Sequence, residues 1–359
     1  MVQHFKQQAK QDLLGLKIID FENAALRSDP RQTAQLKKQY SEFIKNAISE
    51  IGNAAGSQPL VSFEDHKWLF GQAMRALWGK EGFAKAKGDV TLLSQALSTR
   101  TFDCDTSCFV ISDILSQFGV KTKIVSLPSH AVLRIDVKPR KMVEKPAAFY
   151  LETNLFRLTQ GTVEFFIYPT EAAFRTAYPV SYGGMDPDVF PNSMVCSNIG
   201  AFLQSAGRGL ESHGNQKAAS QKYNESIKYF RMAMSLNNKD ANAYFGMGEG
   251  YRSLRDYETA LAYFKKSLEI NPNQVKAYNN IGIIYMIRLP SNDKSETERN
   301  LKTAVEYLKK ALALDPKYMQ ALANLGEADA LLKELHGAEN YKNGSNRGKK
   351  TKQRPDDAN

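Results

Sequence analysis

Regularly spaced apolar residues divide the first part of the chain into helical segments. Residues 3–54 carry apolar side chains at helical spacing, and the Asp29-Pro30 pair interrupts this run where a second helix would begin. A further amphipathic pattern begins at residue 62, where Ser62 and Asp65 have the spacing of a helix cap. The pattern predicts a helical N-terminal region over residues 1–58 and another helix directly after it.

The pattern changes from helix to strand after residue 102. The run CDTSCFVISDILSQFG places Cys104, Cys108, Ile111 and Leu115 on one helical face and ends at Gly119, a residue suited to a helix C-terminus. Residues 121–127, 130–137 and 148–154 then read as three strands, with a basic turn over 138–146. We therefore predict an α+β domain over residues 59–204, in which a helix packs on an antiparallel sheet.

Glycines recur at a fixed spacing in the last third of the chain. Gly214, Gly248 and Gly282 are 34 residues apart, and Gly326 follows after 44, which indicates ten inserted residues, expected as a loop over 287–300. Two units share further positions in phase, namely Tyr244, Tyr251, Ala260, Phe264 and Pro272, then Tyr278, Tyr285, Ala304, Leu308 and Pro316. This pattern resembles the tetratricopeptide repeat (TPR), a pair of antiparallel helices. The resemblance implies an all-α solenoid over residues 205–340, with three repeats and a capping helix.

The first helix of each predicted repeat carries polar side chains of both signs on its inner face. These residues, which we expect to contact a peptide or a protein loop, are Arg208, Asn215, Asn242, Glu249, Arg252, Lys276, Asn279 and Asn280. TPR proteins that bind chaperone tails use a clamp of lysine, asparagine and arginine, which Asn215 and Lys276 match. Glu211, Gly246 and Asn280 stand where the other clamp residues would be needed. We therefore expect a ligand other than a chaperone tail.

The helix–strand segment also contains the side chains of an acyl-transfer site. Cys104 lies in the first turn of the predicted helix, where unpaired backbone N–H groups favour a thiolate. If the strands that carry His130 and Glu152 pair antiparallel, the imidazole and the carboxylate lie side by side. A nucleophile, a base and a carboxylate that orients the base are the parts of a cysteine-dependent site. We therefore predict Cys104, His130 and Glu152 as catalytic residues.

This segment resembles the transglutaminase-like core. The shared features are a cysteine at a helix start, a glycine fifteen residues later, Pro-Ser-His-Ala at the head of a strand and Leu-Glu-Thr one strand on. The core followed by a TPR array is also similar to a bacterial two-domain arrangement. The resemblance implies Cys104 as nucleophile, His130 as base and Glu152 in the acidic position of a papain-type protease, deamidase or transamidase. Two features depart from the family: Glu152 replaces the usual aspartate, and Asp103 and Asp105 flank the thiol and oppose its ionisation.

Other interpretations of these side chains stay open. Cys104 could be an ordinary core residue, and Cys108, one turn further along, is expected to be structural. Asn154 could orient the histidine in place of Glu152. Cys104, Cys108 and His130 are three potential metal ligands, but no fourth ligand has a recognisable spacing. We therefore expect no metal and no cofactor.

The acidic residues of the predicted helix have ordinary structural explanations. Asp103 and Asp105 stand where side-chain oxygens cap a helix N-terminus, and Asp113 is expected to be solvated. The turn-rich segment 178–198 is either a loop of a substrate cleft or a connector to the repeats.

Composition indicates the compartment and the class of partner. Hydrophobic residues make up 42% of the chain and charged residues 24%, as in soluble globular proteins. No apolar run is long enough to span a membrane, the N-terminus lacks the apolar core of a secretion signal, and three cysteines form no disulfide framework. We therefore expect a cytoplasmic protein without membrane contact, and export by a signal-independent route stays open.

Part of the net charge of +10 lies in the C-terminal tail. Residues 341–359 contain six basic and two acidic residues and no apolar pattern, so we predict a disordered, solubilising tail. The tail has no basic residues interleaved with aromatic ones, so nucleic acid is a disfavoured partner.

Two functions are therefore predicted from the sequence. The first is a cysteine-dependent acyl-transfer enzyme that acts on a peptide or protein amide and binds protein through its TPR array. The alternative is a non-catalytic TPR adaptor with an inactive transglutaminase-like domain. The sequence predicts neither the substrate nor the oligomeric state.

Overall fold

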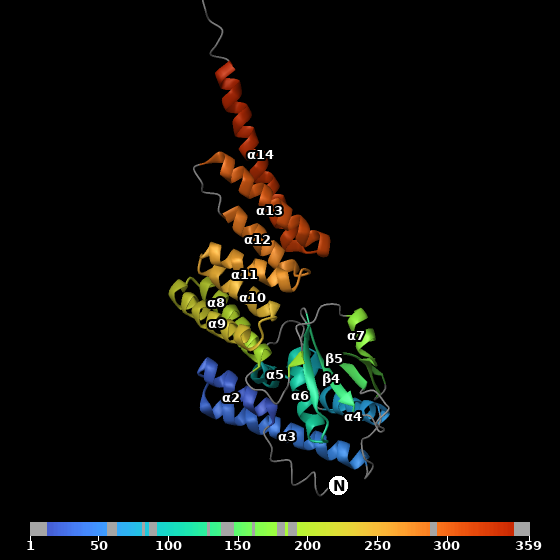
Figure 1. The fold of residues 1–359 in the computed structure, drawn as a ribbon. Helices are drawn as coiled ribbons and strands as arrows, with labels where there is room; N and C mark the ends of the chain where they lie inside the picture. The colour runs from blue at the N-terminus through green and yellow to red at the C-terminus, as the bar shows by residue number, and fades with distance from the viewer. Residues whose placement is uncertain are drawn as a thin grey trace, which may run out of the picture. The chain divides into compact units, whose positions relative to one another are not determined.

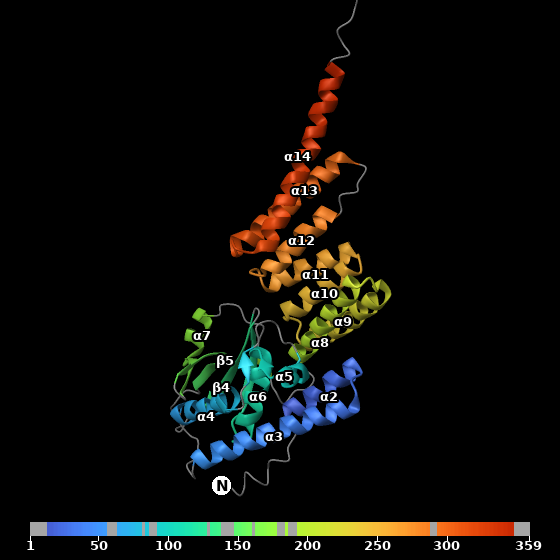
Figure 2. The same cartoon turned by 180° about the vertical axis from the view of Figure 1, so that it is seen from behind.

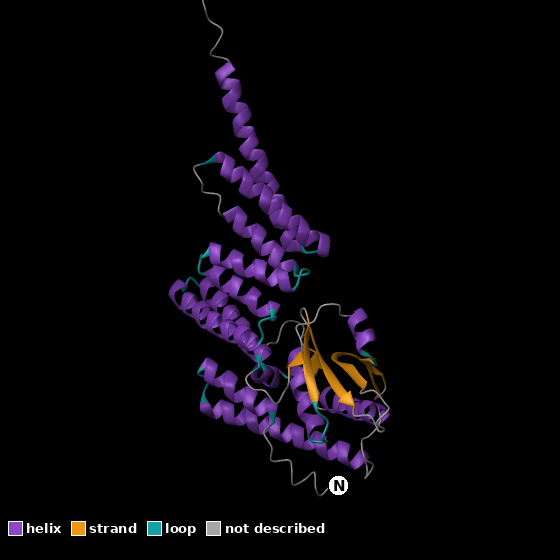
Figure 3. Ribbon diagram, viewed as in Figure 1, coloured by secondary structure: helices purple, strands orange, loops and turns teal. Residues whose placement is uncertain are grey.

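The computed structural model describes residues 13–55, 63–80, 83–85, 92–127, 130–137, 147–159, 162–177, 184–185, 192–287 and 293–347. The chain divides into two compact units, Met1–Gly250 and Tyr251–Asn359. The described part of the first unit combines helices with a β-sheet, and that of the second consists of helices and their connecting turns (Figures 1 and 3).

Helices α2 (Leu14–Leu26) and α3 (Pro30–Ala55) pack together at the start of the first unit. Helix α3 begins at Pro30, as predicted, because the fixed φ angle of proline suits the first helical turn. Helix α2 ends at Arg27, which adopts a left-handed conformation with φ 55°. Helix α4 (Phe63–Arg75), a π-helical turn η1 (Ala76–Lys80) and helix α5 (Leu93–Thr99) follow.

The strands of the first unit form one antiparallel sheet in the order β6-β5-β4-β3-β7. Its members are β3 (Thr122–Leu127), β4 (His130–Val137), β5 (Ala147–Thr159), β6 (Thr162–Tyr168) and the short β7 (Gly184–Met185). A two-residue parallel pair, β1 (Ala84–Lys85) with β2 (Thr101–Phe102), lies outside this sheet. The predicted order of one helix and three strands is confirmed, whereas the predicted basic turn at 138–146 lies outside the described residues.

Helix α6 (Cys104–Ser116) covers one face of the sheet (Figure 2). Alternate residues of β4 and β5, among them Leu133 and Leu151, point into the main core together with the buried side of α6. On the opposite face, Val132 and Tyr150 form a smaller cluster with Phe174 of α7 (Glu171–Ala177). The centre of the sheet is therefore buried on both faces, and the N-terminus of α6 lies close to β4 and β5.

The end of the first unit consists of helices α8 (Ser193–Ser212), α9 (Gln216–Leu236) and α10 (Ala241–Ser253), and the boundary between units falls within α10. The predicted domain boundary at 204/205 falls inside α8. Gly214 has φ +77° in the turn between α8 and α9, so it does not occupy a helical repeat position as its spacing suggested. The close approaches between α8 and α9 occur at Gly207 and Gly200, where an added Cβ would lie 2.5 Å from the ring of Tyr223 and 2.9 Å from the ring of Phe230.

The second unit contains α11 (Tyr257–Ile270), α12 (Val275–Ile287), α13 (Lys294–Leu314) and α14 (Met319–Arg347). Helices α12 and α13 approach closely at Gly282, where an added Cβ would lie 2.7 Å from Leu308. The loop predicted over 287–300 is mostly helical, because α13 already begins at Lys294, and residues 288–292 lie outside the described part. Helix α14 includes the start of the predicted disordered tail, and residues 348–359 lie outside the described part.

Within the described ranges, no helix has the combination of length and apolar character that crossing a membrane requires.

Candidate functional site

Cys104 is the first residue of α6, at the point where the helix meets the sheet. Asp103 caps this helix: its Oδ1 accepts a hydrogen bond from the backbone N–H of Thr106 at 2.9 Å, and the Asp103 N–H donates to Thr106 Oγ1 at 3.0 Å. This reciprocal arrangement fixes the first turn of the helix and with it the position of the thiol. The capping role predicted for Asp103 is confirmed.

The surroundings of the Cys104 thiol oppose its ionisation. Burial raises the pKa of this thiol well above its ordinary value, and the carboxylates of Asp105 and Asp103 raise it further. The thiol donates a hydrogen bond to Asp105 Oδ1 at 3.5 Å. One contact acts in the other direction, because the backbone N–H of Ala131 points at the sulfur and lowers the pKa. Ala131 directly follows His130, so the thiol lies beside the start of β4.

His130 and Glu152 are in direct contact. His130 Nε2 lies 2.5 Å from Glu152 Oε2, and the carboxylate is 0% exposed whereas the imidazole is 18% exposed. The antiparallel pairing of β4 with β5, in which Arg134 lies opposite Tyr150, brings the two residues together. A buried carboxylate against an imidazole can hold the ring in one orientation and stabilise its protonated form. The side chain of Asn154, the alternative orienting residue, lies outside the described part.

Thr153 ties β5 to the first turns of α6. Its hydroxyl lies 2.8 Å from Ser107 Oγ and 3.3 Å from Cys108 Sγ, and its carbonyl oxygen accepts a hydrogen bond from Trp78 Nε1 at 3.0 Å. Cys108 is fully buried, and burial raises the pKa of its thiol. Its position fits the structural role expected for it. Among the described residues, no group of three or more His, Cys, Asp and Glu side chains is placed to bind a metal ion.

Two polar contacts that were not predicted involve the start of α8: one joins α8 to α6, and the other joins α8 to the residue that caps α10. Asn198 Nδ2 donates to Asp105 Oδ2 at 3.2 Å, and the preceding residue, Ser197, donates through Oγ to Asp240 Oδ2 at 3.0 Å. Asp240 in turn caps α10 by accepting from the N–H of Ala243. These partners are far apart along the chain, so local sequence patterns carry no signal for them.

Asp113 is buried, which corrects the expectation that it is solvated. Its carboxylate accepts hydrogen bonds from the N–H groups of Leu14 and Gly15, both at 2.8 Å, and from the hydroxyl of Tyr40 at 2.6 Å. Burial raises the pKa of Asp113 to about 6. Glu22 has the same role at the start of α5, where it accepts from the N–H groups of two successive residues. Both carboxylates are structural and cap helices other than their own.

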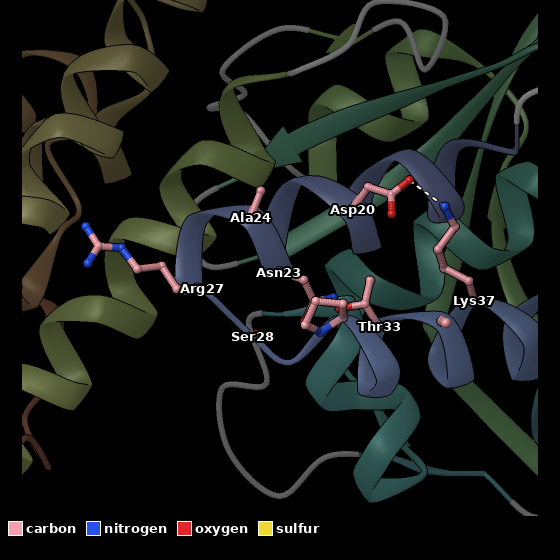
Figure 4. A pocket seen from close by; sticks show the side chains of 9 residues that line it. Asp20, Asn23, Ala24, Arg27, Ser28, Thr33 and Lys37 are labelled. Atoms are coloured by element: carbon pink, nitrogen blue, oxygen red, sulfur yellow. Dashed lines mark hydrogen bonds and ion pairs between the residues drawn. The ribbon is translucent and has the colours of Figure 1, made fainter.

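A hollow of about 440 Å³ lies between α2 and α3 (Figure 4). At this hollow, Asp20 of α2 and Lys37 of α3 form an ion pair at 2.6 Å, and Arg27 points away from the other labelled residues. None of the residues that line this hollow belongs to the predicted catalytic or partner-binding sets.

Two segments match family models described as tetratricopeptide repeat, at residues 241–274 and 296–318. The chain contains tetratricopeptide repeats. The TPR prediction is thereby confirmed, and the described fold is mostly helical with a small antiparallel sheet in its N-terminal part. A comparison with curated proteins found no significant match.

Solved TPR structures show low similarity to this chain. The first TPR of Spaghetti (RPAP3) bound to an HSP90 peptide has 18% identity and a TM-score of 0.28, covering 37% of this chain and 93% of that one. A thermophilic TPR protein from Thermus thermophilus has 21% identity and a TM-score of 0.31, covering 38% and 66%. The second TPR domain of human RPAP3, in complex with an HSP70 peptide, has 16% identity and a TM-score of 0.28, covering 37% and 98%.

The residues expected to contact a TPR ligand in the first unit lie in three different surroundings. Arg208 of α8 is exposed and forms an ion pair with Glu249 of α10 at 3.6 Å. Asn242 of α10 is half-buried. Asn215 is not on a repeat's first helix as predicted but caps α9, where its Oδ1 accepts from the N–H of Ala218. The correction follows from the position of Gly214 in a turn.

The remaining predicted TPR contacts lie in the second unit. Lys276 is exposed on α12, and Arg252 of α10 is half-buried. Asn279 and Asn280 are buried, and Asn279 Oδ1 accepts a hydrogen bond from Asn324 Nδ2 at 2.8 Å. These two asparagines therefore contribute to packing within the unit, and Lys276 is the best exposed of this group.

Proposed function

We propose that this chain is an adaptor that binds a peptide or a protein loop through its TPR helices. The observation that carries the proposal is the match of residues 241–274 and 296–318 to TPR models, because stacked helix pairs of this kind form extended binding surfaces. Arg208 and Lys276 supply exposed charge on the first helices of the repeats.

The ligand is not a chaperone-type carboxylate tail. A clamp would need a side chain at position 246, yet a Cβ on Gly246 would lie 2.2 Å from the ring of Phe230. It would also need a basic residue at position 280, where Asn280 is buried. The ligand in this proposal is therefore a segment recognised along its length rather than by its terminal carboxylate.

Selection from a phage-displayed random peptide library on the full chain tests this proposal. A selected peptide would be labelled and its affinity measured by fluorescence anisotropy. We expect Lys276→Glu to weaken binding at least about tenfold, the effect of losing one well-placed charge contact. Lys309→Glu is the matched control, because Lys309 is equally exposed but lies on α13, the second helix of its pair. Equal affinity of both variants would contradict binding through the first helices.

A second candidate function is cysteine-dependent acyl transfer, supported by the 2.5 Å contact between His130 and Glu152. In this proposal Cys104 transfers its proton to His130 as the sulfur attacks an amide carbonyl, and Glu152 stabilises the resulting imidazolium. Collapse of the tetrahedral intermediate releases the amine with a proton from His130 and leaves a thioester. Water or a second amine then resolves the thioester. The catalytic part would be the transglutaminase-like segment 59–204.

Acetylation by p-nitrophenyl acetate tests the second function without knowledge of the substrate. Peptide mass spectrometry would locate the acetyl group, which we expect on Cys104. His130→Ala should abolish it, and Glu152→Gln should slow it about tenfold or more. Glu42→Gln, an exposed carboxylate of α3, serves as the control. Acetylation of Cys104 at the same rate in His130→Ala and in the unmodified protein would exclude this function.

A further inference from the structure

Asp105 joins the candidate nucleophile to α8, a helix whose Met194, Val195, Ile199 and Leu203 belong to the same hydrophobic core as α6. Its Oδ1 accepts from the Cys104 thiol at 3.5 Å, and its Oδ2 accepts from Asn198 Nδ2 at 3.2 Å. Asn198 belongs to α8 and is 9% exposed, so its amide has few alternative positions. One oxygen of the carboxylate thus accepts a hydrogen bond from the thiol, and the other accepts one from α8.

In addition to these core contacts, hydrogen bonds join α8 to α10. Ser197, next to Asn198, donates to the buried Asp240 that caps α10. About two helical turns further along α8, Gln204 Nε2 donates to the carbonyl oxygen of Gly246 at 2.6 Å. Helix α10 begins the segment that matches a TPR model, residues 241–274. A series of hydrogen bonds therefore links the thiol, through α8, to the first helix of that repeat.

We infer that Asp105, held in place by Asn198 of α8, is a positioning residue that keeps the Cys104 thiol protonated. The inference rests on the proposed acyl-transfer function. In the structure the thiol donates a hydrogen bond to the carboxylate of Asp105. A carboxylate that is anchored on its other side cannot turn away from the sulfur without losing a buried hydrogen bond. The ionisation of the candidate nucleophile consequently depends on where α8 lies.

Other groups around the Cys104 thiol also raise or lower its pKa. Asp103, which caps α6, adds negative charge, and Cys108 lies one turn along this helix. On β4, the N–H of Ala131 favours the thiolate. His130 and Glu152 lie at the start of β4 and on β5. On the far side of Asp105, the buried Asp240 is a further acid, and the charge of Asp105 contributes to raising its pKa. Among these described groups, Asp105 is the one whose oxygen accepts the hydrogen bond that the Cys104 thiol donates.

The test is the pH profile of Cys104 alkylation by iodoacetamide in the full chain, measured by peptide mass spectrometry between about pH 6 and about pH 10. We expect Asp105→Asn to make the reaction about tenfold faster across this pH range, which is the effect of lowering the pKa of the thiol by about one unit. Asn198→Ala should shift the profile in the same direction by a smaller amount. Asp136→Asn removes an exposed carboxylate from β4 and should leave the profile unchanged.

Cys108 and Cys196 report on folding in the same experiment. Both thiols are buried, so they stay unmodified in a folded variant and react in an unfolded one. A profile of Asp105→Asn that superimposes on that of the unmodified protein overturns the inference. A shift in Asp105→Asn without any shift in Asn198→Ala overturns the part assigned to α8.

The readout is independent of enzymatic activity. If acetylation of Cys104 does not require His130 but the Asp105→Asn shift is present, the acyl-transfer function fails and the role of Asp105 in holding the thiol stands. If acetylation requires His130 but the profile does not move, the positioning role fails alone.

Discussion

Glu22 offers a direct test of how burial sets the stability of the first unit. Its two carboxylate oxygens accept hydrogen bonds from the backbone N–H groups of Leu93 and Ser94, both at 2.8 Å, and so cap α5. Burial nevertheless raises the pKa of Glu22 from 4.5 to about 7, because removal of water outweighs the two donors. Replacement of Glu22 by glutamine keeps the size of the side chain and removes the ionisable group.

The sign of the effect follows from proton binding. Between about 4.5, the value for the unfolded chain, and about 7, the folded protein binds the proton of Glu22 more tightly than the unfolded chain does. The free energy of unfolding that this proton supplies is fully present below the lower value and is lost as the pH rises through the upper one. The difference between the two values corresponds to roughly 3 kcal/mol.

Urea unfolding of the full chain, followed by circular dichroism between about pH 5 and about pH 8, measures this difference. The unmodified protein should lose stability as the pH rises, and Glu22→Gln should lose less, by up to roughly 3 kcal/mol. Asp113 and Asp240, whose pKa values burial raises to about 6, should leave some pH dependence in the variant. Glu42→Gln, which removes an exposed carboxylate, should follow the unmodified protein. A difference between Glu22→Gln and the unmodified protein that stays constant across this pH range would refute the reasoning.

Three further substitutions test packing, capping and backbone conformation, each by urea unfolding. Gly246→Ala should lower the free energy of unfolding by about 1–3 kcal/mol, because its methyl group would meet the ring of Phe230. Gly209→Ala, which has open space around it, should leave this free energy unchanged or raise it. Equal effects of the two substitutions would count against the close approach. Asp113→Ala should lower the free energy of unfolding by about 3 kcal/mol or more, since it leaves three buried donors without an acceptor, and Asp113→Asn should lower it less. Identical losses in the two variants would be inconsistent with the role of Asp113 as a hydrogen-bond acceptor. Arg27→Gly should raise the free energy of unfolding by about 0.5–1 kcal/mol, because glycine adopts positive φ without strain. A decrease would show that the contacts of the arginine side chain stabilise the fold by more than its backbone strain destabilises it.

Features with a local cause could be predicted from the sequence. Pro30 at the start of α3, Asp103 at the cap of α6 and the strands that carry His130 and Glu152 all follow from residue types within a few positions of each other. The contact between His130 and Glu152 also follows, because alternation along two adjacent antiparallel strands leaves few other arrangements. Such features depend on backbone geometry that the neighbouring residues determine.

Features that depend on distant partners could not be predicted. Asp113 looks like a solvated helix residue until Leu14 and Tyr40, 99 and 73 residues away, are known to donate to it. The link between Asp105 and Asn198 spans 93 residues and has no periodic pattern. Gly214 is the opposite case: its spacing of 34 residues from Gly248 predicted a helical repeat position, but it lies in a turn with positive φ. Spacing alone does not distinguish a glycine required by helix packing from one required by positive φ.

The ring of Phe230 lies against Gly200 of α8 and Gly246 of α10, whose added Cβ atoms would come within 2.9 Å and 2.2 Å of it. Three positions on three helices therefore share one volume. A larger residue at 200 or 246 would fit without strain only in a sequence whose residue 230 had lost its aromatic ring. Substitutions at these three sites should therefore be correlated among related sequences. A recombinant chain that took two of the three residues from one parent and the third from another would fold poorly.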